Sequence, residues 1–464
     1  MEEFLQIDAA LIKKIDSIIL ENIALKKENA VLREENKVLR EEIARLKDRL
    51  GLNSKNSSIP SSKELYKIKK ENRQKSSRNP GGQPGHKGHK RDEMVADETI
   101  RIPLNSMTCE CGGEIRLGQN HVHQKIEIPE IKPHITEYHM ERGRCRTCGR
   151  RKSSNLPQGV TNDLFGPRVK AIASALTGFY KNSKREVEAI LKDIFNLKIS
   201  LGTISNNEHR VSEKAKDNYE TTELELSYSA MLHADETSHY TKGKMGWCWL
   251  FSNLQSTILK LSNSRGMKVL EDSVFGANDY SVIISDRYAA YNYFNKDNRQ
   301  ICWAHLARDF ERFANSSNPE VKAIGENLRD VNREIFALKQ SLLCGEIDIL
   351  RFLRRSKKLK SRTWHYLKNI YKMEEATQAS RVAKNMLKSE NMMWKFLEDP
   401  INIPLTNNHA EQQIRHYVTY RKNSYFTWSE RGNRFLERII SLYLTCRQKN
   451  ENPYLFLNNI LTTH

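Results

Sequence analysis

Apolar residues recur every seven positions along residues 11–50, which is the pattern of a coiled coil. Position d is filled by Leu25, Leu32, Leu39 and Leu46. Position a is filled by Ile15, Asn22, Asn29, Asn36, Ile43 and Leu50. Leucine at d with asparagine at a favours a parallel two-stranded coil, because the buried amides pair only in that arrangement.

The charged positions beside this seam also favour a dimer. Glutamate occupies position g, and a basic residue follows five places later at position e: Glu21 with Lys26, Glu28 with Arg33, Glu35 with Arg40, and Glu42 with Lys47. All four pairs attract in a parallel, in-register homodimer. The alternative is a long solvated helix. We predict a leucine zipper over residues 1–50 and a homodimeric chain.

The hydrophobic pattern stops after this segment. Residues 51–95 are rich in Ser, Asn, Gly, Pro and Lys and poor in aliphatic side chains. This composition predicts a flexible basic linker. It can lie along a phosphate backbone, or it can simply connect two domains.

Helical periodicity returns over residues 158–225. "GPRVKAIASALTGFYKN" has apolar residues at helical spacing after a Gly-Pro start. The stretch that follows, up to Lys216, predicts a helix, a short turn near "LKISLG", and a second helix from about Thr203. This is helix-turn-helix geometry, whose second helix can enter a major groove. Helical hairpins also occur in folds that never touch DNA.

Residues 226–315 change to short apolar runs. "SAMLHAD", "GWCWLFS" and "STILKLS" predict an antiparallel meander, and the continuous run "YSVIIS" predicts a strand covered on both faces. "SRGMKVLEDSVFG", "RYAAYNYF" and "LARDFERFAN" are expected to be helical, and "QICWAH" a strand. The predicted order is three strands, helix, strand, helix, strand, helix.

Residues 316–400 are again helical and basic. Within them, residues 350–372 carry nine lysines and arginines, with Trp364 and Tyr366 between them. That mixture suits nucleic acid through phosphate pairing and base stacking. A solvated amphipathic helix is the alternative. Residues 401–464 close the chain with further helical segments.

The net charge of the chain indicates a class of binding partner, which the hydrophobic pattern alone does not. Lysine and arginine number 76 against 57 acidic residues, which gives the 464-residue chain a net charge of +19. A clustered surplus of this size favours a polyanionic partner, nucleic acid before membrane. No run approaches the roughly 18 apolar residues of a membrane span. The acidic start "MEEFLQ" lacks a signal-peptide pattern, so we expect a cytoplasmic protein.

Four of the eight cysteines form two close pairs, which in a reduced chain indicates metal. The ligands would be Cys109, Cys111, Cys145 and Cys148. We expect them to hold one structural Zn²⁺ in a domain spanning residues 96–157. The first pair, C-x-C, is shorter than the usual C-x₂₋₄-C. One ligand can therefore be replaced by a histidine (His121, His123 or His139), and four unliganded thiols are the alternative.

Two aspartates end buried strands. Asp235 closes the first predicted strand, and Asp286 follows "VIIS" at its carboxyl end, where open α/β sheets place their sites. If the first and fourth strands lie side by side, the two carboxylates converge. Unpaired buried carboxylates are costly, and oxygen ligands suit Mg²⁺ or Mn²⁺. Two such ions roughly 3.5–4 Å apart can clamp a phosphodiester.

A third acidic ligand can come from a helix. Glu411 stands in "NNHAEQQIRHY", a helix start with Asn407 or Asn408 as possible cap, and Glu236 is the next candidate. Asp286 can instead cap the helix that follows it. His305 and the basic or amide side chains after Glu411 can bind phosphate or pack as ordinary surface residues; these are Arg415, Arg421, Lys422 and Asn423.

Taken together, the chain resembles transposases of the insertion-sequence-sixty-six family almost from end to end. The resemblance is carried by the zipper, "NSKNSS", "GGQPGHKGH", the two cysteine pairs, "DET…GKMGWCWLF", "SDRYAAY", "CWAHLARDF" and "NNHAEQQIR…YRKNSYF". It implies a DDE catalytic core of ribonuclease-H-like fold, with Asp235, Asp286 and Glu411 as the metal-binding triad. It also implies that an α-helical insertion separates the last two.

The expected fold is multidomain, mainly α with an α/β core. Its parts are a coiled coil (1–50), a basic linker (51–95), a zinc-binding domain (96–157), a helical helix-turn-helix-like region (158–225), the first part of the core (226–315), a basic helical insertion (316–400), and the end of the core with C-terminal helices (401–464).

The expected function is DNA transposition: water cuts the element's end, and the freed 3′-hydroxyl joins target DNA without a covalent protein intermediate. The resemblance implies a bacterial, nucleoid-associated protein in a dimeric or larger synaptic assembly. It also suggests other proteins encoded by the same element as partners. The alternatives are a non-catalytic, zinc-containing DNA-binding regulator and a structure-selective nuclease on the same fold.

Overall fold

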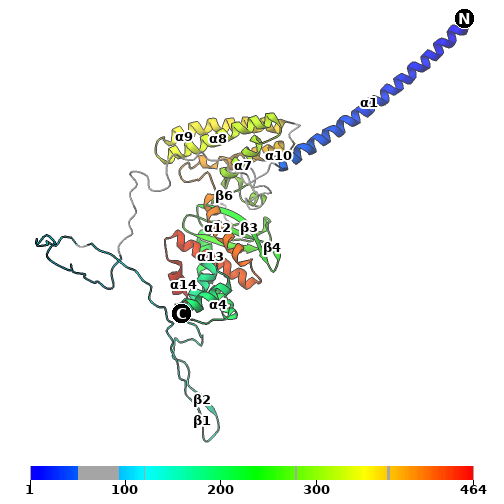
Figure 1. Ribbon diagram of the computed structural model, residues 1–464. Coiled ribbons are helices and arrows are strands. Elements are labelled where there is room, and N and C mark those ends of the chain that lie inside the picture. The colour runs from blue at the N-terminus through cyan, green and yellow to red at the C-terminus, as the bar shows by residue number, and fades with distance from the viewer. Residues whose placement is uncertain (1, 51–93, 120, 277–279, 374–376, 463–464) are drawn as a thin grey trace.

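The computed structural model describes residues 2–50, 94–119, 121–276, 280–373 and 377–462 (Figure 1). The predicted linker lies outside these residues except at its last two positions. Residues Glu2–Leu50 form one uninterrupted helix, α1. Its d-position leucines are exposed, and the a-position asparagines Asn22, Asn29 and Asn36 bond to carbonyls of their own helix. The pairing of α1 with a second chain stays a prediction.

Residues 94–119 and 121–157 hold little regular structure. Two short antiparallel strands, β1 (Arg142–Arg144) and β2 (Arg151–Ser153), make a hairpin around the second cysteine pair. Apolar side chains of the predicted zinc-binding domain, such as Ile102 and Ile128, are exposed. The described part of this domain therefore consists mainly of turns that do not bury these side chains. This is the expected state of a segment that lacks a hydrophobic core.

The helical region forms as predicted. It contains α2 (Pro167–Ser174), the π-helical turn η2 (Ala175–Phe179), α3 (Lys184–Asp193), α4 (Leu201–Lys214) and α5 (Lys216–Ser227). A capping box between Ser183 and Glu186 begins α3, and the Ser200 side chain caps α4. The second helix of the hairpin thus begins at Leu201, two residues before the predicted start. Its contact with DNA stays a prediction.

A five-stranded mixed sheet forms the centre of the molecule. Its strands are β3 (Met231–Thr241), β4 (Lys244–Ser252), β5 (Thr257–Ser262), β6 (Val282–Ser285) and β7 (Arg299–Ile301), in the order β5-β4-β3-β6-β7. The first three form the predicted antiparallel meander. β6 pairs in parallel with β3, and β7 in parallel with β6. The expectation that the first and fourth strands are neighbours is confirmed.

The short connections depart from the predicted helices. "SRGMKVLEDSVFG" contains only the short α6 (Lys268–Glu271), and "RYAAYNYF" forms the 3₁₀ turn η3 (Ala289–Tyr293), followed by η4 (Lys296–Asn298). Tyr291 and Phe294 are buried under the sheet. The conformation of this segment is set by the packing of these aromatic rings and not by the helical pattern of the local sequence.

Helices cover both faces of the sheet. Cys248, Leu250 and Leu259 pack against α12 (Asn408–Ser424) and α13 (Glu430–Gln448), beside which lies α14 (Pro453–Thr462). The opposite face, with Trp249 and Phe251, packs against α5, α6 and η3. Edge strand β5 is protected, because its backbone N–H groups donate to α13 side chains at a spacing of four, namely Glu437, Ser441 and Thr445.

Between β7 and α12 the chain forms a helical unit with its own core. It consists of α7 (Trp303–Ala314), α8 (Pro319–Leu343), α9 (Ile349–Lys372), α10 (Thr377–Leu387), α11 (Glu390–Met393) and η5 (Lys395–Leu397). Figure 1 shows α8 and α9 side by side as the yellow pair beyond the sheet. None of the helices described is both long and apolar enough to cross a membrane.

The α9 aromatics do not stand free between the basic residues. Trp364 and Tyr366 pack against the core of the helical unit, and the Trp364 Nε1 donates to Glu390 at 2.6 Å. The prediction that Trp364 and Tyr366 stack on nucleic-acid bases is therefore corrected, because both rings lie on the apolar face of α9. Its exposed face keeps cations such as Arg354, Lys357 and Lys358.

Candidate active site

The parallel register of β3 and β6 brings two aspartates together. Met231 is opposite Val282, and His233 is opposite Ile284. The same offset continued by two residues sets Asp235 opposite Asp286, the residue that follows β6. Neighbouring strands lie about 4.8 Å apart, so these carboxylates emerge from adjacent positions at the centre of the sheet.

The electrostatics of Asp235 reflect this crowding. Burial raises the pKa of Asp235 well above its usual value, and the charges of Glu236, Asp286 and Glu411 raise it further. A hydrogen bond from the Glu236 N–H, 2.9 Å from Oδ1, only partly offsets this. Without a cation, ionising Asp235 is therefore unfavourable.

The sequence left two roles open for Asp286, a helix cap or a metal ligand. Its Oδ1 accepts the backbone N–H of Tyr288 at 2.8 Å, in the turn before η3. Tyr288 is the cap residue of η3 and no side chain caps that turn, so the capping role is wrong. The Asp286 side chain stays close enough to raise the pKa values of Asp235 and Glu236, so Asp235 and Asp286 form a carboxylate cluster.

Glu411 reaches the cluster from the first turn of α12, and Asn407 anchors that turn. Asn407 is 2% exposed. Its Nδ2 donates to the Ala234 carbonyl at 2.8 Å, and its Oδ1 lies 2.9 Å from the His233 Nδ1. Asn407 occupies the cap position of α12, but its side chain does not cap the helix; it ties the helix to β3 beside Asp235.

His305 and Cys302 lie on the other side of Glu411. The His305 Nδ1 and Glu411 Oε1 are 3.7 Å apart, and neither buried atom has a hydrogen-bond partner. The Cys302 Sγ accepts the Asn407 N–H at 3.2 Å. Burial lowers the pKa of His305, and Arg308 lowers it further, whereas Asp286 and Glu411 act in the opposite direction.

Among the residues described, Cys302, His305 and Glu411 are the group of three whose ligand atoms all lie within 4.8 Å of one another, so together they can hold a metal ion. The oxygens of Asp235, Asp286 and Glu411 form no group that tight in this part of the chain.

Two arginines that the sequence patterns did not single out contact acidic residues on β3 and just after β6. Arg299 is buried behind Asp286 and donates to its carbonyl and to Ser285; burial lowers the pKa of Arg299 to about 10. Arg265 pairs with Glu236 at 2.6 Å, and its guanidinium lies over the rings of Trp247 and Tyr288. No local pattern could have found them, because each partner is distant in sequence.

Glu236 faces away from the carboxylate cluster. Successive strand residues point to opposite faces, so Glu236 enters the layer under the sheet, where Arg265 and the Tyr291 hydroxyl occupy its oxygens. As a substitute for Glu411 it is therefore less suitable than the sequence alone indicated.

The predicted phosphate-binding residues follow Glu411 along α12. Arg415 is exposed one turn beyond Glu411. Arg421 binds the Ser238 hydroxyl at 2.9 Å and also the Ser238 carbonyl, so it fastens the end of α12 to β3. Lys422 is exposed, and Asn423 donates to the Lys181 carbonyl at 3.5 Å.

The two cysteine pairs occupy two glycine-containing turns. Gly112 and Gly149 adopt positive φ values of 86° and 70°, which lets nearby amides face the sulfur atoms. N–H groups of Cys148 and Thr147 lower the pKa of Cys145 to about 7, and Cys111 lowers that of Cys109. Within the described chain the four thiols are not gathered into one group. Zinc binding stays a prediction.

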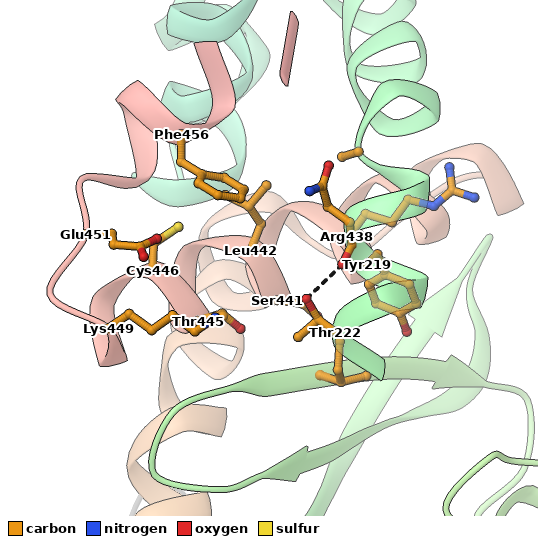
Figure 2. Close-up of a pocket in the computed structure, with 13 residues that line it drawn as sticks. Tyr219, Thr222, Arg438, Ser441, Leu442, Thr445, Cys446, Lys449, Glu451 and Phe456 are labelled. Carbon is orange, nitrogen blue, oxygen red and sulfur yellow. Dashed lines mark hydrogen bonds between the residues drawn. The ribbon is translucent and has the colours of Figure 1, made fainter. Parts of the chain in front are cut away.

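Figure 2 shows a pocket away from these residues. It has a volume of about 110 Å³ and lies among α5, β5, α13 and the segment leading into α14, with Tyr219, Ser441 and Cys446 on its wall. None of the predicted site residues lines it. The candidate site lies instead around Asp235 on β3 and Asp286 just after β6, and these two strands are neighbouring inner strands of the sheet.

Comparison with known families gives two matches. A model described as "Transposase IS66 family" matches residues 179–434, more than half of the chain. The matched range contains both aspartates, the helical unit and Glu411. A model of a family of unknown function matches residues 10–92. No curated protein matches the chain.

Proposed function

Since the chain belongs to the IS66 family of transposases, we propose that it cleaves the ends of its insertion sequence and transfers them into target DNA. The observation that supports this most is the β3–β6 register, which sets Asp235 opposite Asp286, with Glu411 near enough to perturb Asp235. The order of three antiparallel strands followed by two parallel ones fits the ribonuclease-H-like core proposed for this family.

We propose that Asp235, Asp286 and Glu411 hold two Mg²⁺ or Mn²⁺ ions. The donor set is made of carboxylate oxygens, which these hard cations prefer. The raised pKa of Asp235 and the unpartnered Glu411 Oε1 both fit a site that needs positive charge. When bound, such ions activate the attacking hydroxyl and stabilise the leaving oxygen of a phosphodiester.

The chain's own residues then supply position and polarity. Asn407 fixes the start of α12 against β3, and in this proposal Glu411, in the first turn of that helix, joins the two aspartates as the third ligand. His305 lies against the Glu411 Oε1 and, when its Nδ1 carries the proton, can orient that carboxylate. Arg415, one turn further along α12, is suited to a phosphate of the bound strand.

DNA binding in this proposal is mainly electrostatic. The net charge of +19 and the exposed cations of α9 attract the phosphate backbone. The α3–α4 hairpin is the proposed reader of the element's end. We also propose that α1 pairs two chains as a parallel coiled coil, so that two element ends can be held together, and that the four cysteines bind one structural Zn²⁺.

The test is cleavage of a labelled element end with Mg²⁺ or Mn²⁺ by the parent and by the variants Asp235→Ala, Asp286→Ala and Glu411→Ala. Each should lose cleavage and joining, because in-line displacement needs all three ligands, and each should still bind DNA. Glu326→Ala, which removes an exposed carboxylate from α8, is the matched control and should cleave normally.

The outcomes separate the candidate functions. Normal cleavage by Glu411→Ala alone would move the third ligand elsewhere. Normal cleavage by all three variants would mean that these carboxylates do not carry the reaction and would overturn the proposed site. No cleavage by the parent despite tight binding would favour the non-catalytic DNA-binding regulator. Cleavage without joining would favour a nuclease.

A further inference from the structure

Two aromatic side chains stand in solvent on the segment that joins α12 to α13. Tyr425 is 82% exposed and Trp428 is 76% exposed. The aromatics of α9 are packed, as described above, so this pair is the better placed to meet a ligand. Exposed rings grouped on one segment are typical of binding surfaces.

The backbone that presents these rings is unusual. Tyr425 and Phe426 adopt φ values of 52° and 73°, a left-handed conformation that bulky residues rarely take. Such a conformation persists only where the surroundings enforce it, and it tends to occur at functional sites. The segment that carries Tyr425 and Phe426 is therefore a rigid turn and not a flexible loop.

Contacts on both sides enforce the turn. The Thr427 N–H donates to the Tyr240 carbonyl at 3.3 Å, and the Lys242 N–H donates to the Thr427 carbonyl at 3.0 Å. The Phe426 ring lies 4.9 Å from that of Tyr240. The Thr427 hydroxyl is 2.5 Å from Asn433 in the buried network around His239. Phe426 and Thr427 thus point inward, which leaves Tyr425 and Trp428 outside.

The surroundings of the exposed pair are basic. Lys242 is exposed in the β3–β4 turn and Lys244 at the start of β4, and Lys422 and Arg431 are exposed on either side of the pair. Glu430 is the exposed acid among these segments. Aromatic rings within a cationic surface are the composition of sites that bind unstacked nucleic-acid bases.

The distance between the carboxylates and the exposed rings would allow both to contact one strand of DNA. Six residues of β3 separate Asp235 from Thr241, which at about 3.3 Å per residue is roughly 20 Å. Fourteen residues separate Glu411 from Tyr425, which at 1.5 Å per residue of helix is about 21 Å. At 3.4 Å per nucleotide of a strand, this is about six nucleotides.

We propose that Tyr425 and Trp428 form a stacking site for an unstacked base of the element end, about six nucleotides from the bond that is cut. This inference rests on the proposed function. It adds a second contact with the DNA, to an unstacked base, which the three carboxylates would not recognise. Lys242 and Lys422 hold the flanking phosphates, and the rigid turn keeps the rings exposed before DNA arrives.

The experiment uses the full-length chain and duplexes of the element's terminal sequence. A single mismatch is moved through positions three to nine from the cleavage site, because a mismatch lowers the cost of unstacking. The parent should bind most tightly when the mismatch is near position six. Trp428→Ala should weaken that complex roughly five- to 150-fold, the range for one lost stacking contact.

Variants and DNA together isolate the stacking. Removing the base near position six should weaken the parent but should weaken Trp428→Ala no further. Tyr425→Gly removes the ring while accepting the left-handed backbone, so it remains folded; Tyr425→Phe should bind as the parent does. Tyr228→Ala removes an exposed ring at the end of α5 and should change nothing.

The two proposals fail in distinguishable ways. Asp235→Ala should lose cleavage and keep the preference for position six. If the parent cleaves ends while Trp428→Ala and Tyr425→Gly bind every duplex as the parent does, the stacking site is overturned alone. If Trp428→Ala and Tyr425→Gly change only the mass of the assembly, the exposed rings contact another protein chain, and the stacking site is overturned. If the parent binds no element end, both proposals fall.

Discussion

Asn407 offers the sharpest test of how the site is assembled. Its buried amide joins α12 to β3 through the Ala234 carbonyl and the His233 ring. Since Nδ2 donates to the carbonyl, Oδ1 must accept from the His233 Nδ1–H. Burial lowers the pKa of His233 to about 4, so the ring is neutral at pH 7 and carries one proton.

Asn407→Ala should therefore leave one donor and one acceptor unsatisfied in the interior. Each costs about 1–3 kcal/mol, so the free energy of unfolding should fall by roughly 2–6 kcal/mol. The start of α12 should also shift. A displacement near 1 Å at Glu411 should lower cleavage by about 10²-fold while DNA affinity stays the same.

Asn408→Ala is the matched control, because Asn408 is the next residue and its side chain is exposed. Its effect on the free energy of unfolding, measured by urea titration, should stay within about 0.5 kcal/mol. Cleavage by Asn408→Ala should equal that of the parent. Similar stability and cleavage for the two variants would refute the anchoring role of Asn407.

Three further predictions concern the rest of the chain. Light scattering should give the parent the mass of at least two chains, and Leu32→Glu with Leu39→Glu should reduce it toward one; an unchanged mass would exclude the zipper. Elemental analysis should find about one Zn²⁺ per chain, and less after Cys145→Ser. In metal-free buffer at pH 8, Asp235→Asn should be more stable than the parent. The raised pKa of Asp235 means that the parent loses about 1.4 kcal/mol per pH unit between its unfolded and folded pKa values, so the gap should close toward pH 4.

The arrangement of the sheet was predictable because its signals are local. Continuous apolar runs marked β3 and β6, and the meander before β6 limited the positions that β6 could take. Asp235 and Asp286 follow from that topology, because the β3–β6 register sets the two residues opposite one another. The prediction that Asp235 ends its strand is wrong, because β3 continues to Thr241 through its antiparallel pairing with β4. The turn at Ala289–Tyr293 was not predictable in type, because the choice of 3₁₀ over α geometry depends on how Tyr291 packs under the sheet.

The third carboxylate belongs to a different kind of problem. A helical unit with its own core separates Glu411 from Asp286, so no strand register can locate it. Its position depends on the docking of α12, in which Asn407 bonds to residues more than 170 positions earlier in the chain. The pattern around Asn407 indicated a helix cap, and the folded chain uses the amide for a tertiary contact. The position of the aspartates is thus set by the sheet, whereas the proposed three-carboxylate site also needs α12 to be docked. This is why Asn407 should matter for cleavage as much as for stability.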